Sequence, residues 1–315
     1  MAKYRTDLPQ ASGRVFLSDG GLETTLIFHD GFELPCFEAF TLLDSDEGMA
    51  ALRAYYRRYA LMARTRGMGF LLETPTWRAN PDWGAKVGYS AVALADVNWR
   101  AVDLMLEIRS EFETKASPMV ISGAIGPRGD GYDPGTLMSP DEAEAYHARQ
   151  VGVFAATDAD MVTAFTLTNA PEAIGIARAA RAAAIPAVIS FTLETDGRLP
   201  TGQPLGEAIQ EVDAATVGGP AYYMINCAHP THFEDALEAG QPWLSRLRGI
   251  RANASMLSHA ELDECTTLDA GDPADLGRRY GRLRSRLAHV NVVGGCCGTD
   301  HRHIEEIGDV YGKAA

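Results

Sequence analysis

Short apolar runs recur along the chain at intervals that suit strands separated by helices. Eight such runs are rich in branched or aromatic residues and are bounded by Gly, Pro, Asn or Asp, a pattern that predicts strands. Each run is apolar on both faces, as expected of buried parallel strands. The predicted strands span residues 14–20, 68–74, 118–124, 160–166, 186–192, 221–227, 248–254 and 289–295.

The segments between these runs carry the three- and four-residue spacing of helices. The segment 139–156 opens with Ser139 as a candidate N-cap, followed by Pro140 and by acidic residues in the first turn. The other predicted helices cover 49–67, 90–112, 169–184, 204–212, 272–288 and 299–312, with a shorter helix between residues 228 and 247.

Strands that alternate with helices predict parallel pairing through crossover helices. We therefore expect an α/β fold, a (β/α)8 TIM barrel, with residues 1–315 forming a single domain. An open doubly wound sheet is the alternative, but it normally carries a G-x-G-x-x-G turn after its first strand. The DGGLE at residues 19–23 lacks that spacing, and no repeat or Pro/Ser-rich linker divides the chain.

Composition narrows the class of function. The formal net charge of −14 argues against a nucleic-acid-binding or anionic-membrane surface. No apolar run reaches the 18 residues of a membrane span, and the first residues lack the apolar stretch of a signal peptide. Five cysteines in 315 residues do not form a disulfide scaffold. We therefore expect a reduced, cytoplasmic, globular protein.

Three of the cysteines fall at predicted strand ends. Cys227 ends the sixth strand, and Cys296 and Cys297 follow the eighth, within GGCCGT. The carboxyl ends of barrel strands meet at one face, so these thiols should converge there. Three thiolates favour Zn²⁺ and leave a fourth coordination position open, as in catalytic zinc sites. Taken singly, a buried Cys227 or a redox-active adjacent pair are the alternatives.

Zinc held by three thiolates suits a soft fourth ligand. A substrate thiol bound there stays deprotonated near neutral pH, and the thiolate is the nucleophile that the thiol is not. The residues therefore predict S-alkylation, most simply attack on a methyl group attached to a positively charged leaving group. Cys227, Cys296 and Cys297 are thus the candidate metal ligands and catalytic residues.

Five motifs, in the same order along the chain, resemble the homocysteine S-methyltransferase family. They are DGGLET at 19–24, SGAIGPRG at 122–129, SFT at 190–192, INC at 225–227 and GGCCGT at 294–299. The family consists of zinc-dependent (β/α)8 enzymes that make methionine. The resemblance implies that the three cysteines named above are the zinc ligands and that homocysteine is the methyl acceptor.

The resemblance also implies substrate-binding residues. Asp19, Gly20 and Gly21 match the segment that holds the amino-acid part of homocysteine through backbone groups, and glycines permit close approach of a carboxylate. Glu23 lies in the same segment and is a further candidate. Asn226 precedes a proposed ligand and is a candidate for orienting it.

Two positions depart from the family pattern. After the fourth strand the family usually has a glutamate that reads the amino group of the substrate, and this chain has Phe165 there, whose ring face can still attract a cation. After the second strand ETPTW replaces a TNTF-like segment, so Glu73 is a candidate for the missing carboxylate. A different thiol or selenol is therefore the alternative acceptor.

No module for cobalamin or folate is visible, which favours a small cationic methyl donor such as S-methylmethionine, S-adenosylmethionine or a betaine-like ammonium. Trp77, Trp83 and Tyr132 lie in loops expected at the same face and offer aromatic surface to such a cation. A non-catalytic zinc or redox sensor with a Cys296–Cys297 disulfide is the alternative outside the enzymes. We expect small-molecule partners, no nucleic acid or membrane, and a possible homo-oligomer.

Overall fold

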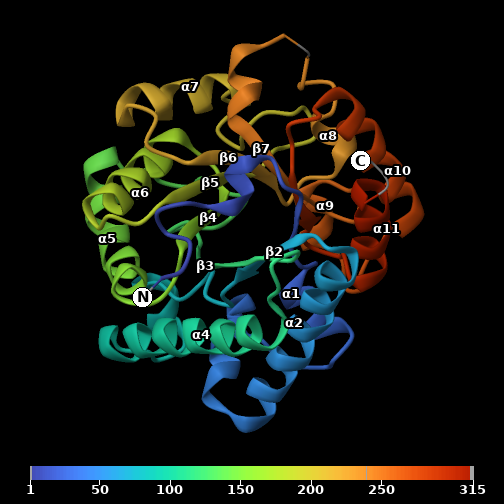
Figure 1. Cartoon of the computed structure of the whole chain (residues 1–315). Helices are drawn as coiled ribbons and strands as arrows, with labels where there is room; N and C mark the ends of the chain where they lie inside the picture. Colours follow the sequence, from blue (N-terminus) through green and yellow to red (C-terminus); the bar gives the residue numbers. More distant parts are fainter. Residues whose placement is uncertain (1, 239, 313–315) are drawn as a thin grey trace.

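Eight parallel strands close into a barrel whose strand order is the chain order (Figure 1). The computed structural model describes residues 2–238 and 240–312. The strands are β1 (Phe16–Leu17), β2 (Gly69–Glu73), β3 (Met119–Ile125), β4 (Met161–Leu167), β5 (Ala187–Phe191), β6 (Tyr222–Asn226), β7 (Leu247–Ala252) and β8 (Val292–Gly295). Each strand pairs with the next, and β8 pairs with β1. The predicted (β/α)8 barrel is confirmed.

Long helices surround the barrel and agree with the predicted segments. They are α2 (Asp46–Arg66), α4 (Ala91–Phe112), α5 (Pro140–Ala156), α6 (Ala170–Ala182), α7 (Leu205–Thr216), α10 (Pro273–Arg286) and α11 (His301–Gly312). Ser139 caps α5 in a capping box with Glu142, as its position predicted. The shorter helix expected after β6 is two pieces, α8 (Pro230–Phe233) and a 3₁₀ turn (Pro242–Arg246).

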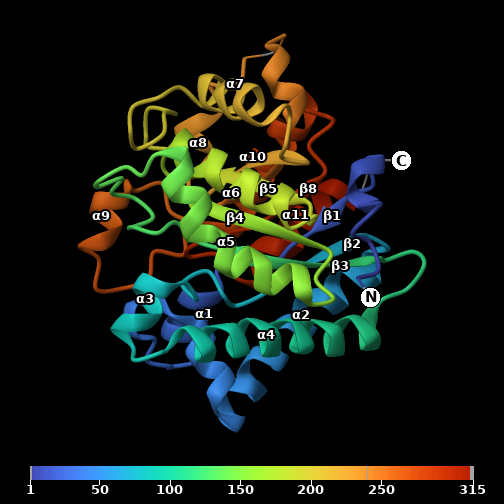
Figure 2. The same cartoon turned by 90° about the vertical axis from the view of Figure 1, so that its left-hand side faces the viewer.

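Three short helices in the loops were not predicted. They are α1 (Leu22–Phe28), α3 (Pro81–Lys86) and α9 (His259–Asp263); 3₁₀ turns lie before β1 at Pro9–Ser12 and between α1 and α2 at Pro35–Phe37 and Ala39–Asp44. All three helices follow strands, and Figure 2 shows α3 and α9 at one end of the barrel, with the N terminus toward the other. No described helix has both the length and the apolar character needed to cross a membrane.

Two sets of buried residues form the core. The larger set lies between strands and helices, and the smaller set fills the barrel interior with side chains that include Phe16, Leu71, Val120 and Met224. Alternate strand residues therefore point inward and outward, and both faces of every strand are covered. This arrangement explains why the strand segments read as uninterrupted apolar runs.

Residues before β1 close the amino-terminal end of the barrel. The Asp160 carboxylate accepts from Arg109 at 2.8 Å and from the backbone N–H groups of Tyr4 at 2.7 Å and Ile121 at 2.9 Å. Its side chain is fully buried. A buried carboxylate with several N–H partners is satisfied within the protein, so this end of the barrel is built for stability.

Candidate active site

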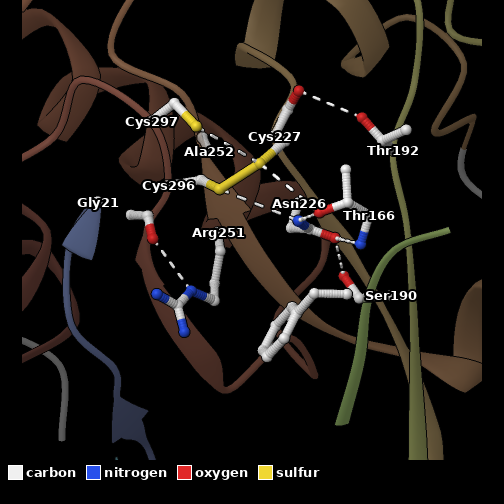
Figure 3. The surroundings of a disulfide bond; sticks show 12 residues. Gly21, Thr166, Ser190, Thr192, Asn226, Cys227, Arg251, Ala252, Cys296 and Cys297 are labelled. Atoms are coloured by element: carbon white, nitrogen blue, oxygen red, sulfur yellow. Dashed lines mark hydrogen bonds between the residues drawn. A yellow bond between two sulfur atoms is a disulfide. The ribbon is translucent and has the colours of Figure 1, made fainter. Parts of the chain in front are cut away.

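Three sulfur atoms lie together at the carboxyl-terminal end of the barrel (Figure 3). Cys227 follows β6, and Cys296 and Cys297 follow β8; their sulfur atoms all lie within 4.8 Å of one another. A disulfide joins Cys227 to Cys296, and the Cys227 and Cys297 sulfurs are 3.9 Å apart. The two loops therefore bring the three predicted residues to one point.

The backbone around Cys227 is held in an unusual conformation. Its φ is 53°, in the left-handed region that non-glycine residues rarely occupy. The Cys227 N–H donates to the carbonyl of Arg251 at 3.2 Å, and its carbonyl accepts from Thr192 at 3.3 Å and the His259 ring at 2.6 Å. Contacts from β7, from the residue after β5 and from α9 thus hold a turn that places the sulfur beside Cys296 and Cys297, and such strain is characteristic of functional sites.

Asn226, at the end of β6, contacts the sulfur cluster. Its side-chain oxygen accepts from the Thr166 N–H at 2.9 Å and the Ser190 hydroxyl at 2.6 Å. Its side-chain nitrogen donates to the Thr166 hydroxyl at 2.8 Å and points at the Cys296 sulfur, 3.9 Å away. These four contacts use the whole amide, so Asn226 acts on the cysteines and has no group left for a substrate.

The donor set suits a soft metal. Within the described residues, the cluster consists of three cysteine sulfurs and includes no histidine or carboxylate. Burial raises the pKa of the Cys297 thiol to about 11, so a bound cation would be needed to hold it as thiolate near neutral pH. The disulfide must be reduced before all three sulfurs can act as ligands. The Cys296–Cys297 pairing expected of a redox sensor is wrong, because Cys296 is bonded to Cys227.

The segment Asp19–Gly21 packs against the cysteine loop. The Asp19 carboxylate accepts from Arg251 Nη2 at 2.6 Å and from the Tyr55 hydroxyl at 3.0 Å. The Gly21 N–H donates to the carbonyl of Thr299 at 3.0 Å. A Cβ on Gly21 would lie 2.6 Å from the Cys296 carbonyl oxygen, so only glycine fits this close approach. These groups make their contacts within the protein and hold the loop after β1 against the loop after β8.

Glu23 and Glu73 are two carboxyl groups with raised pKa values near the site. Glu23 is partly exposed in the first turn of α1; burial raises its pKa to about 7, and the charge of Asp19 adds to the shift. Burial on β2 raises the pKa of Glu73 to about 8. Thr163 donates to its Oε1 at 3.5 Å, and its Oε2 has no partner among the described residues.

The raised pKa of Glu73 bears on its predicted role. Glu73 was a candidate for the carboxylate that binds an ammonium group because it precedes the TPTW segment. Burial inside the barrel, which the sequence does not reveal, favours its uncharged form, so an ammonium group bound there would have to lower its pKa.

Phe165 lies beside a buried guanidinium that the sequence analysis missed. The Phe165 ring centroid is 5.1 Å from Arg251 Cζ. Arg251 on β7 donates through Nε to the Gly295 carbonyl at 3.0 Å and through Nη2 to Asp19 and to the Gly20 carbonyl, the latter at 3.2 Å. An arginine at the carboxyl end of a buried strand was the available signal, since arginine is rarely buried without a partner.

The predicted aromatic surface is only partly available. Arg78 is stacked on Trp77 and Trp83, with its Cζ 4.0 Å and 3.5 Å from the two ring centroids. The Tyr132 hydroxyl lies 3.7 Å from the Cys297 sulfur, and its ring stacks on His259 at 4.0 Å. The tryptophans are therefore engaged by a cation of the protein, whereas Tyr132 lies against the sulfurs.

Comparison with known proteins assigns the chain to a family. The sequence profile described as "Homocysteine S-methyltransferase" matches residues 16–311, which include every strand and all three clustered cysteines. The chain belongs to the homocysteine S-methyltransferase family. This confirms the resemblance noted in the motifs and makes the protein a methyltransferase.

Individual relatives of this homocysteine S-methyltransferase family member share little sequence identity with it. "Homocysteine S-methyltransferase 4" of Zea mays is 23% identical over 319 residues, covering 94% of this chain and 89% of the maize protein. The homocysteine methyltransferase MmuM of Escherichia coli, in its oxidized form, superposes with a TM-score of 0.76 at 20% identity, covering 95% and 97% of the two chains. Its metallated form gives 0.72 at 21% identity, covering 94% and 96%. These structures share the barrel fold.

Proposed function

We propose that this homocysteine S-methyltransferase family member moves a methyl group from a small cationic donor to the thiolate of homocysteine, giving methionine, with Zn²⁺ as cofactor. The observation that carries the proposal is the convergence of the Cys227, Cys296 and Cys297 sulfurs within 4.8 Å at the strand ends. S-Methylmethionine, S-adenosylmethionine and a betaine-like ammonium compound are the candidate donors.

Zinc would be held by Cys227, Cys296 and Cys297 after reduction of the disulfide. When bound, it would keep the acceptor sulfur deprotonated at neutral pH. The E. coli relative has been solved in both a metallated and an oxidized form, which supports two states for such a cysteine cluster. Asn226 would orient Cys296 through its 3.9 Å contact, and the Tyr132 hydroxyl would donate to the Cys297 sulfur.

The proposed reaction is an in-line displacement at carbon. The acceptor sulfur forms a bond to the methyl carbon, and the bond from that carbon to the donor sulfur or nitrogen breaks with its electron pair. The positive charge of the donor is thereby neutralised. In this proposal the backbone groups of Asp19, Gly20 and Gly21 hold the amino-acid part of the acceptor, and the partly exposed Glu23 carboxylate attracts the cationic donor.

Cobalt substitution tests the metal and the acceptor together. We would reduce the protein, load Co²⁺ and add homocysteine, expecting a saturable sulfur-to-cobalt charge-transfer band in addition to that of the three cysteines. Cys297→Ser should weaken the metal spectrum, whereas Cys265→Ser, at an exposed cysteine outside the cluster, should leave it unchanged. The proposal would be overturned if the reduced protein bound no cobalt, or if no added thiol changed the spectrum of the bound cobalt.

Phe165 favours a second candidate, the same chemistry on a different thiol or selenol. The buried phenyl ring stands where the family usually has a carboxylate that reads the amino group of homocysteine. A panel of thiols and selenols, each with the same donor, separates the candidates. Strong turnover of homocysteine alone would exclude the second.

A further inference from the structure

We propose that Arg251 binds the carboxylate of the acceptor, so that the enzyme selects thiols by their acid group and not by their amino group. This inference rests on the proposed function, because it concerns the molecule that the cysteine cluster would methylate. It defines a substrate class: short aliphatic thiols that carry a carboxylate, with or without an α-amino group.

Arg251 lies at the level of the site. In the barrel register it is the partner of Asn226 on β6 and of Gly294 on β8, the residues immediately before Cys227 and Gly295. Figure 3 shows its side chain extending below the three cysteines toward the chain segment that holds Gly21. A thiol bound at the sulfur cluster would therefore direct its other end toward this guanidinium.

One end of the guanidinium remains available. Nε and Nη2 donate to the Gly295 carbonyl, to Asp19 and to the Gly20 carbonyl. Nη1 makes no hydrogen bond within residues 2–238 and 240–312, yet it is not a fully buried atom. It therefore keeps solvent contact although the side chain is only 9% exposed. A carboxylate is the natural acceptor for such a charged donor.

The charge on Arg251 is secured by the protein. Burial opposes the charged form, but the Asp19 carboxylate 2.6 Å away, together with Glu73 and Tyr55, raises the pKa of Arg251. Asp19 is the single carboxylate hydrogen-bonded to the guanidinium in the described residues. The guanidinium is thus a fixed cation that an anionic ligand group can share with Asp19.

The surroundings offer little to an ammonium group. Phe165 provides a ring and no hydrogen-bond acceptor, and its face is already used by the Arg251 guanidinium 5.1 Å away. A second cation beside that guanidinium would be repelled. The Asp19 carboxylate is occupied by Arg251 and by the Tyr55 hydroxyl. The partly exposed Glu23 carboxylate serves the cationic donor in the proposed function. An α-amino group should therefore contribute little to acceptor binding.

Three thiols of nearly equal length test this inference. They are homocysteine, 4-mercaptobutanoate, which lacks its amino group, and 3-aminopropane-1-thiol, which lacks its carboxylate. Binding is measured as the dissociation constant from the charge-transfer band of the reduced, cobalt-loaded protein, so no methyl donor is needed. We expect the first two to bind within about threefold of each other and the third at least tenfold more weakly, as for loss of a charged hydrogen bond.

Two variants make the test specific. Arg251→Lys keeps a cation beside Asp19 but removes the second N–H fork, so it should weaken both acids by tenfold or more and leave 3-aminopropane-1-thiol nearly unchanged. Phe165→Glu restores a carboxylate and should favour homocysteine over 4-mercaptobutanoate by tenfold or more. Phe165→Gln, the neutral control, should not. If Arg251→Lys is poorly folded, the ratio of the dissociation constants of the two acids in the wild-type protein still tests the inference.

The outcomes distinguish a failure of the role of Arg251 from a failure of the proposed function. A wild-type protein that binds homocysteine at least tenfold better than 4-mercaptobutanoate would overturn the role of Arg251, as would an unchanged preference for acids in Arg251→Lys. The proposed methylation of a thiol would survive both results. If none of the thiols alters the cobalt spectrum, the proposed function itself fails, and this inference fails with it.

Discussion

The two ends of the barrel contain similar groups and use them in opposite ways. At the amino-terminal end, Arg109 and Asp160 form a buried ion pair, and two backbone N–H groups complete the contacts of the carboxylate. At the carboxyl-terminal end, Arg251 and Asp19 form a comparable pair, but Nη1 of the arginine has no partner within the described chain. The first pair is closed to ligands, and the second is open on one side.

The difference shows how a single fold separates stability from chemistry. Polar groups whose hydrogen bonds are all made within the protein contribute to folding and have no free donor or acceptor for a ligand. Polar groups without a hydrogen-bond partner cost stability, as does a left-handed backbone conformation such as that of Cys227. They are retained where binding of a ligand can compensate for that cost. Substitutions at the two ends should therefore affect different measurements.

The largest effect is expected from Asp160→Ala. It leaves the Arg109 charge buried without a partner, which typically costs about 3–5 kcal/mol. We expect this loss in the free energy of unfolding measured by urea denaturation, with zinc content per folded molecule unchanged. Asp141→Ala, which breaks the exposed ion pair with Arg178, is the control and should cost less than about 1 kcal/mol. Equal effects of the two substitutions would contradict the contrast between buried and exposed pairs.

Cys297→Ser should have the opposite profile. Removing a ligand should lower zinc affinity by more than the roughly 10–100-fold typical of groups that merely support a ligand. Zinc content after dialysis against a chelator and methyl transfer should fall together, while urea stability of the metal-free, reduced protein changes little. The exposed Cys36 provides the matched control, Cys36→Ser, with unchanged zinc content. A Cys297→Ser protein that kept zinc and activity would refute the proposed ligand set.

Glu73→Gln should stabilise the protein, increasingly so as the pH rises. The native state holds the Glu73 proton up to a pKa of about 8, whereas the unfolded chain releases it near its ordinary value. Native stability therefore falls as the pH rises between these two values, and glutamine removes that loss. We expect a gain on the order of 2 kcal/mol at pH 8 relative to pH 5 in urea denaturation. Glu305→Gln, at an exposed position on α11, should show no such gain. A gain independent of pH would disprove burial as the cause.

The smallest effect is expected from Glu23→Gln. With a pKa of about 7, Glu23 gains its charge between pH 6 and pH 8, facing Asp19, Arg251, Arg78 and Cys297. The KM for a cationic donor should therefore fall about 5–10-fold over that interval in the wild-type protein and stay flat in the variant. An unchanged KM profile in Glu23→Gln would remove Glu23 from the proposed donor site.

Much of the fold was predictable because the barrel repeats one local pattern. All eight strands coincide with the predicted runs, and three of them (β3, β4 and β7) extend one residue beyond, since strands buried on both faces need continuous apolar sequence. The convergence of Cys227 with Cys296 and Cys297 followed from the rule that strand ends share a face. The helix α1 was missed because its seven residues are too few for a clear helical period.

The parts of the site that the sequence did not predict depend on contacts between residues far apart along the chain. Arg251 lay inside an apparently apolar run, and its pairing with Asp19 spans 232 residues. Trp77 and Trp83 were candidates for an aromatic surface that faces a cationic donor, and Arg78 stacks on both rings. The protonated state of Glu73 depends on burial among strands that only the folded chain defines. Such choices of partner cannot be read from spacing along the chain.

The hydrogen bond between Gly21 and Thr299 has a consequence for how the protein is made. It joins residues 278 positions apart, and it lies beside the cysteine cluster. During synthesis on the ribosome, the first strand must therefore wait for almost the whole chain before its last neighbour arrives. The carboxyl-terminal face of the barrel is then the final part to assemble. Cys227 is synthesised 69 residues before Cys296, so during that part of synthesis its thiol lacks the two sulfurs that surround it in the folded protein.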